Sequence, residues 1–168
     1  MSVMGCHALQ VSCQGFADRT GDAFFADDAF ANETALFKMS NGSTMRICEF
    51  RQVGCPSREM FRIFGTRGSF ESGHWLTNQQ ATPVSVDEMR DPLPQEVARA
   101  FAAATGREDY LGGHGGSHAY LVHEFVSAVA AGRQPAIDVV TAARYAACGV
   151  MAHESALHEG QWLQVPDW

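Results

Sequence analysis

The chain has 168 residues, of which 46% are hydrophobic, 10% aromatic and 18% charged, and its formal net charge is −7. This length and composition predict one folded domain over residues 1–168, with a single sizeable core. Because the net charge is negative and no cluster of Lys and Arg stands out, we expect no nucleic-acid partner.

The cysteines and the apolar segments indicate a cytoplasmic protein without a membrane partner. No apolar stretch approaches the roughly 20 residues that span a bilayer, and the N-terminal residues lack the basic and apolar regions of a signal peptide. The cysteines share no paired spacing such as C-x-x-C, so the sequence indicates neither a disulfide framework nor a zinc knuckle. These cysteines are Cys6, Cys13, Cys48, Cys55 and Cys148.

The first half of the chain reads as β structure. Residues 7–16 form a plausible strand, and the acidic, glycine-punctuated stretch 15–30 reads as a loop. Asn41-Gly42 separates two further runs and predicts a hairpin with a type I′ turn. Alternation continues through residues 58–65, which predicts a third strand in the same sheet, and a short strand is expected at residues 69–71.

The second half is predicted to be mainly helical. Residues 74–94 show little periodicity, which predicts a long segment without regular secondary structure. A helix is predicted to follow from Pro94 to Gly106. Another helix is predicted from Ser117 to Gly132, and Asp138 is a good N-cap for the last one. Residues 161–166 end the chain as a short strand. The predicted fold class is α+β, an open and mainly antiparallel sheet with helices packed on one face.

The stretch GGHGGSH, residues 112–118, is the first candidate site. Its glycines allow positive φ and close approach to a ligand, and Ser117 could cap the helix that follows. It is not a phosphate-binding fingerprint, because no strand directly precedes it and no G-K-[ST] follows. His114 is either a site histidine, suited to proton transfer or to contact with sugar hydroxyls, or an ordinary loop histidine.

Two other groups of residues could form a site of a different kind. His114 and His118 form an H-x-x-x-H pair that could bind zinc, but the intervening glycines disfavour a regular turn, so we expect no metal site. The cluster of His153, Glu154, Ser155 and His158 is interpreted as the solvated C-terminal end of a helix. A serine hydrolase is disfavoured because Ser155 lacks a G-x-S-x-G setting.

Charged residues punctuate the apolar strands of the first half. Such a face is either half solvated or packs against another subunit, and the second interpretation is slightly favoured, which predicts a homo-oligomer through the sheet face. Trp75 and Trp162 are expected in the core or at an interface. The charged residues are Arg46, Glu49, Arg51, Arg58, Glu59 and Arg62.

Residues 32–72, with the F-K-M-S-N-G turn and the G-T-R-G-S turn, together with residues 112–168, resemble the C-terminal domain of the glucose-fructose oxidoreductase / inositol dehydrogenase (Gfo/Idh/MocA) family. The resemblance extends from roughly residue 8 to the end. The G-H-G-G stretch is also similar to one in the NAD-dependent glycosidase branch of that superfamily. The family's G-x-G-x-x-G, its E-K-P stretch and its D-x-x-x-H helix are not in this sequence, and all three would belong upstream of residue 1.

The resemblance implies a substrate-binding and dimerisation domain of an NAD(P)-dependent oxidoreductase that acts on a sugar, polyol or related compound. NAD or NADP would be held by an upstream Rossmann domain, so we expect this chain alone to bind no cofactor and to be inactive. His114 is the implied catalytic residue, with a substrate-binding set around it. The alternatives are a standalone dimerising module without catalysis, or the same domain of an NAD-dependent glycosidase. The substrate-binding set is Gly113, Gly115, Gly116, Ser117, His118 and Tyr120.

Overall fold

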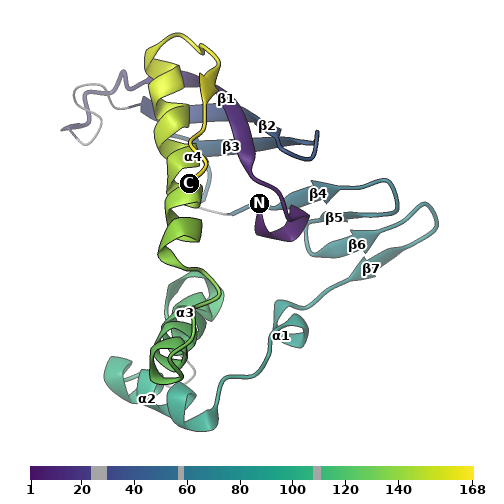
Figure 1. Cartoon of the computed structure of the whole chain (residues 1–168), viewed down its shortest axis with the longest axis vertical. Coiled ribbons are helices and arrows are strands. Elements are labelled where there is room, and N and C mark those ends of the chain that lie inside the picture. Colours follow the sequence, from purple (N-terminus) through teal and green to yellow (C-terminus); the bar gives the residue numbers. More distant parts are fainter. Residues whose placement is uncertain (24–29, 57–58, 108–110) are drawn as a thin grey trace. The chain divides into compact units, whose positions relative to one another are not determined.

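A computed structural model describes residues 1–23, 30–56, 59–107 and 111–168 (Figure 1). The chain divides into two compact units, the first formed by residues 1–54 and 137–168 and the second by residues 55–136. Each unit combines an antiparallel sheet with helix. The predicted α+β class with antiparallel sheets is therefore confirmed, and the predicted loop at 15–30 lies partly outside the described residues.

The first unit contains a four-stranded antiparallel sheet in the order β3-β2-β1-β8. These strands are β1 (Ala8–Ala17), β2 (Phe30–Met39), β3 (Thr44–Phe50) and β8 (Leu163–Gln164), and a short 3-10 helix, η1 (Ser2–Met4), precedes them. The strands predicted near residues 7–16 and 161–166 are confirmed, and so is the hairpin around Asn41.

Helix α4 (Val139–Leu157) covers one face of this sheet and forms the core with it (Figure 1). From Val11 onward the sheet contributes odd-numbered side chains, because alternate residues of a strand point to one face. The helix contributes small side chains, which let its backbone approach the sheet closely. Burying a side chain as large as Phe37 stabilises the fold by roughly 1.5–3 kcal/mol. The principal core residues are Val11, Cys13, Ala35, Phe37, Ala147, Cys148, Ala152 and Ala156.

The hairpin turn differs from the predicted type I′ geometry. Gly42 has a φ of 83°, but Asn41 is not among the residues with positive φ. The Gly42 amide donates to the Met39 carbonyl and the Met39 amide donates to the Ser43 carbonyl, which defines a three-residue loop closed by a glycine bulge. The Asn41 side chain explains the difference, because its Oδ1 accepts from both the amide and the hydroxyl of Ser43.

The second unit contains its own sheet of four short antiparallel strands, in the order β4-β5-β6-β7. The prediction that residues 58–65 add a strand to the first sheet is wrong, because β4 (Arg62–Phe64) pairs with β5 (Ser69–Glu71). The prediction that residues 74–94 form a long segment without regular structure is also wrong. This segment contains β6 (His74–Leu76), β7 (Ala81–Pro83) and the short helix α1 (Val86–Met89).

A type I′ turn does occur in this chain, between β5 and β6. Ser72 has a φ of 50° and Gly73 a φ of 75°, and the flanking Glu71 and His74 are paired. Positive φ at both central residues is the mark of this turn, which matches the twist of a hairpin. The three-residue strands on either side are too short for alternation to be read from the sequence.

Two longer helices complete the second unit. Helix α2 (Gln95–Thr105) begins after Pro94 and ends at Gly106, as predicted, and Gly106 has a left-handed φ of 64°. Helix α3 (Gly113–Ala130) begins four residues before the predicted start at Ser117. Its apolar stripe is largely exposed within the described structure, at Leu121, Val122, Phe125, Val126 and Val129. No helix among the described residues is both long and apolar enough to cross a membrane.

Candidate functional site

The start of α3 has an irregular backbone. Gly112 and Gly116 have φ values of 95° and 86°, and His114 has a φ of 53°. Left-handed backbone at a residue with a side chain costs roughly 1–2 kcal/mol. Such conformations are concentrated at functional sites, where the surrounding structure holds them. Both His114 and His118 lie within α3, but the turn between them is not regular.

The side chain of His118 explains two of the glycines. A Cβ at Gly112 would lie 2.5 Å from the His118 Cβ, and a Cβ at Gly113 would lie 3.0 Å from the His118 Cε1. The imidazole therefore lies against the backbone of these two residues. At Gly112 a side chain would collide with His118, and at Gly113 the ring would have to shift slightly. Gly116 is required by its positive φ and by the Leu111 side chain, which a Cβ would approach to 3.2 Å.

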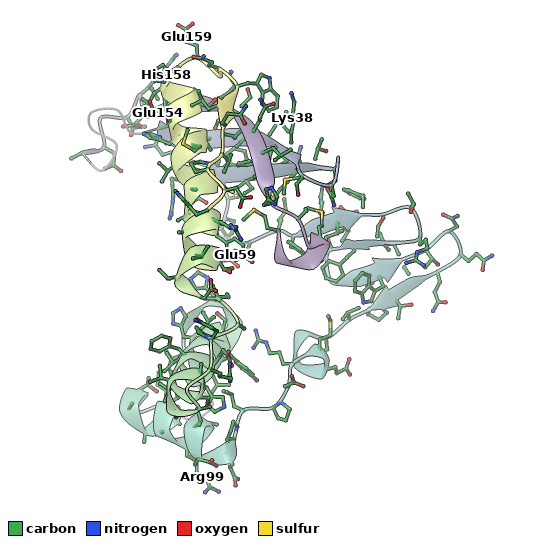
Figure 2. All side chains as sticks on the ribbon, viewed as in Figure 1. Lys38, Glu59, Arg99, Glu154, His158 and Glu159 are labelled. Atoms are coloured by element: carbon green, nitrogen blue, oxygen red, sulfur yellow. The ribbon has the colours of Figure 1, made fainter. Side chains whose placement is uncertain are left out.

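His114 forms an ion pair or hydrogen bond with Glu59. The distance from His114 Nδ1 to Glu59 Oε1 is 2.8 Å, and the two side chains are 65% and 82% exposed. Exposed pairs of this kind contribute little to stability. What the contact does is fix the orientation of the imidazole. Figure 2 labels Glu59, which belongs to the segment just before β4.

The remaining predicted substrate residues lie along the same stretch of α3. The backbone amide of Gly113 donates to His118 Nδ1 at 3.1 Å, and the rings of His114 and His118 have centroids 5.6 Å apart. Tyr120 lies below the Arg90 guanidinium, which is 5.1 Å from the centre of its ring. The structure therefore brings the two histidines and their glycines together.

Ser117 does not have the predicted capping role. The N-cap residue of α3 is Gly112, and it makes no side-chain capping bond. Ser117 lies inside the helix and Gly115 lies two residues before it, so both share the irregular turn. The Ala119 amide donates to the Leu111 carbonyl at 3.0 Å, which ties this irregular turn to the residue just before it.

Sequence reasoning missed Glu59 as a member of this site. It was noted only as one of the charged residues on an expected sheet face, 55 positions before His114. No spacing rule links the two residues, so only the fold could reveal the contact. Arg58, from the same set, lies outside the described residues. Within the described residues, no three His, Cys, Asp or Glu side chains are grouped as a metal ion would require.

The cluster near the end of α4 has a structural role. Ser155 is fully buried, accepts a hydrogen bond from the Cys13 amide at 2.9 Å and donates one to the Gln161 carbonyl at 2.6 Å. His158 Nδ1 donates to the Glu154 carbonyl in the last turn. Glu154, His158 and Glu159 lie at this end of the helix (Figure 2). Ser155 therefore holds the fold together and is not placed as a nucleophile.

A second pair of a histidine and a glutamate lies in the first unit. His153 Nδ1 is 2.8 Å from Glu33 Oε1, and its ring packs edge-on against Phe30 with a centroid distance of 5.7 Å. The contact links α4 to β2. It resembles the pair of His114 and Glu59 chemically, but His153 lies in the regular part of α4 and does not have positive φ.

The antiparallel sheets, the late helices and the glycine-rich start of α3 define a C-terminal domain of the Gfo/Idh/MocA type, which confirms the resemblance seen in the sequence. Residues 22–168 match the family described as glycosyl hydrolase 109, C-terminal domain. The chain belongs to this family.

One curated protein and several solved structures are similar to this chain. A glycosyl hydrolase family 109 protein from Stenotrophomonas maltophilia (strain K279a) is 26% identical over 144 residues, which are 80% of this chain and 30% of that protein. Levoglucosan dehydrogenase, in complex with NADH and levoglucosan, has a TM-score of 0.66 at 18% identity, over 96% of this chain and 46% of its own. UDP-N-acetylglucosamine 3-dehydrogenase from Acidithiobacillus ferrooxidans has a TM-score of 0.59 at 20% identity, over 90% and 40% respectively. The chain therefore spans less than half the length of these relatives.

Proposed function

We propose that this chain is the sugar-binding domain of an NAD(P)-using enzyme that acts on glycosides, with the start of α3 as the contact surface. The family match over residues 22–168 supports the glycoside hydrolase branch. The observation that carries the proposal is His114 itself. It combines left-handed backbone, flanking glycines that allow close approach and an imidazole oriented by Glu59.

In this proposal each side chain has a simple role. His114 accepts or returns a proton at a sugar hydroxyl, for which an imidazole is suited near neutral pH. Gly113, Gly115 and Gly116 let the sugar approach the backbone. Ser117, His118 and Tyr120, which follow in the same helix, provide polar contacts beside it.

The cofactor would be held elsewhere in the whole protein. Dinucleotides bind at a parallel βαβ unit with a glycine-rich turn, and both sheets in the described part of this chain are antiparallel. These residues do not fit NAD or NADP. We therefore expect an upstream Rossmann domain to supply the cofactor, whose chemistry is hydride transfer.

The test is kinetic and uses the full-length protein that contains this domain. His114→Ala should lower kcat at least tenfold, because a positioned acid or base contributes a factor of about 10²–10⁴. The matched control is His74→Ala, an exposed histidine on β6 of the same unit. Unchanged kinetics for His114→Ala would remove this residue from the site.

A sugar dehydrogenase is the second candidate, and the solved neighbours favour it, since two of them are dehydrogenases by name. The two candidates differ in the fate of the cofactor. A dehydrogenase reduces one NAD(P) for each sugar oxidised, whereas an NAD-using glycosidase releases an alcohol or phenol without net reduction. Measuring absorbance of the reduced cofactor and release of nitrophenol from a nitrophenyl glycoside, in the same reaction, separates them.

A further inference from the structure

We infer that Glu59 and the backbone of Gly113 hold His114 and His118 in opposite tautomers, so that the pair presents one hydrogen-bond acceptor and one donor to adjacent hydroxyl groups of a sugar. The tautomers follow from hydrogen bonds within the second unit. The identity of the ligand rests on the function proposed above.

The proton of His114 is placed by its partner. The carboxylate of Glu59 can only accept, so the ring nitrogen 2.8 Å away, Nδ1, must carry the hydrogen. A neutral imidazole has a single ring proton. The Nε2 of neutral His114 therefore carries a lone pair, and it is available to take a proton from a hydroxyl group.

The proton of His118 is placed on the other nitrogen. The backbone amide of Gly113 can only donate, so His118 Nδ1, at 3.1 Å, must be the acceptor. In the neutral ring the hydrogen then lies on Nε2. His118 thus offers a donor where His114 offers an acceptor.

The two rings are placed to act together. Their centroids are 5.6 Å apart, and they tilt against each other by 55°. Among the described residues, neither Nε2 has a hydrogen-bond partner. An acceptor beside a donor matches two neighbouring hydroxyl groups, one of which donates while the other accepts.

Glu59 is therefore a positioning residue, which acts through His114. Which nitrogen of a histidine is protonated is set by the hydrogen bond that the other nitrogen makes. Without the carboxylate, nothing in the described structure holds the His114 proton on Nδ1. The tautomer of His118 does not depend on Glu59, because its partner is backbone.

The first test is ¹⁵N NMR of the imidazoles in this chain, at about pH 8, above the ordinary histidine pKa of about 6.5. His114→Gln and His118→Gln identify the two ring systems. We expect His114 to be protonated on Nδ1 and His118 on Nε2. Glu59→Ala should move the His114 proton to Nε2 or average it between the nitrogens, and leave His118 unchanged. Glu88→Ala, at an exposed carboxylate of α1, is the control.

Either of two results overturns the tautomer assignment: His114 protonated on Nε2 in the unaltered chain, or a His114 tautomer indifferent to Glu59→Ala. Levoglucosan is then added as the probe sugar. We expect the Nε2 signals of both histidines to shift. If the signal of one or both histidines does not shift, the recognition of adjacent hydroxyls is overturned.

Kinetics of the full-length protein keep this inference separate from the proposed function. Glu59→Ala should lower kcat/KM severalfold, with partial recovery in Glu59→Gln, whose amide oxygen can still accept. If the tautomers are as assigned but His114→Ala is fully active, the proposed function fails. If His114→Ala is inactive but His114 in the unaltered chain is protonated on Nε2, the function stands and the tautomer assignment fails.

Discussion

At the scale of single residues, Ser155 shows why a polar side chain in a cluster of titratable groups need not be catalytic. Its hydroxyl is fully buried and satisfied on both sides, by the Cys13 amide on β1 and by the Gln161 carbonyl beyond α4. A buried hydroxyl that lacked these partners would destabilise the fold. This single side chain therefore joins three segments of the first unit.

Replacing Ser155 should test that role. Ser155→Ala leaves a buried donor and a buried acceptor without partners, so we expect it to lower the free energy of unfolding by about 1–3 kcal/mol. Urea unfolding followed by circular dichroism measures the change. Ser12→Ala is the control, because its hydroxyl makes one bond, to the Gly160 carbonyl, at a partly buried position. A loss for Ser155→Ala no larger than for Ser12→Ala would contradict the assigned role.

Cys13 gives a prediction for alkaline pH. Burial raises the pKa of this thiol from 9.0 to about 11, and the Glu33 carboxylate adds to the shift. Since the unfolded thiol ionises first, the stability that this group contributes is complete below pH 9 and is lost as the pH rises toward 11. At pH 8, iodoacetamide should label the exposed Cys48 and Cys55, and leave Cys13 unlabelled.

Mass spectrometry of tryptic peptides reads out the labelling. Urea-unfolded protein serves as the control, in which Cys13 should react as fast as the others. Labelling of Cys13 in the folded chain at the rate of Cys48 would contradict its burial.

How far the sequence predicts the site differs from residue to residue. The glycines and His114 could be singled out, because positive φ and close approach are properties of residue types. The contact of His114 with Glu59 could not, because it joins a loop to a helix through the folded chain. The stacking of His118 on Gly112 and Gly113 likewise depends on a rotamer that no spacing rule provides.

At the scale of secondary-structure elements, the ends of two helices were easier to predict than the sheet to which each strand belongs. Pro94, Gly106 and Asp138 act locally, through fixed φ, left-handed φ and a capping oxygen, and each lies where it was expected. The assignment of β4 to the first sheet failed because alternation along a strand does not say which strand it pairs with. The strands β6 and β7 have only three residues each and gave no alternation to read.

The cap of α4 yields a prediction with a pH dependence. Asp138 Oδ1 accepts from the Thr141 amide at 2.7 Å, and this bond lowers the pKa of the carboxyl. Asp138→Ala should lower the urea midpoint at pH 7, whereas Asp138→Asn, an equally good cap, should largely retain it. Because the folded pKa is lowered, the charge-dependent part of the cap is present above the ordinary Asp pKa of about 3.9 and is lost as the pH falls below it.

The difference in the free energy of unfolding between the unaltered chain and Asp138→Ala should therefore become smaller as the pH is lowered. Unfolding curves at pH 7 and pH 3 measure it. An Ala variant as stable as the unaltered chain at pH 7 would show that the carboxylate does not cap this helix.

At the scale of the whole molecule, oligomerisation depends on which sheet face is open. The charged residues expected on one face are divided between the two sheets, since Arg46 lies on β3 and Arg62 pairs with Glu71 in the second sheet. The face of the first sheet opposite α4 combines Arg46 with Leu36 and Phe50, whose side chains are half exposed. A face of this composition is suited to pack on a second copy.

We expect a dimer through this face. Leu36→Lys should convert it to monomer in sedimentation or light scattering, because it places a charge at the centre of the apolar contact. Phe64→Lys is the matched control, since Phe64 is even more exposed but lies in the other sheet. A dimer that survives Leu36→Lys and dissociates with Phe64→Lys would assign the contact to the second sheet.

The size of the whole protein decides which activity this domain can serve. The chain spans 30% of its curated relative and 46% of levoglucosan dehydrogenase, so the relatives carry a large additional part. An antibody raised against these 168 residues should detect, in cell extracts, a protein of roughly twice the chain's 18.2 kDa or more, since a cofactor domain adds roughly 150 residues. A band at 18.2 kDa would instead favour the standalone module that dimerises without catalysis, because a histidine at a sugar hydroxyl transfers no hydride unless a cofactor is bound beside it.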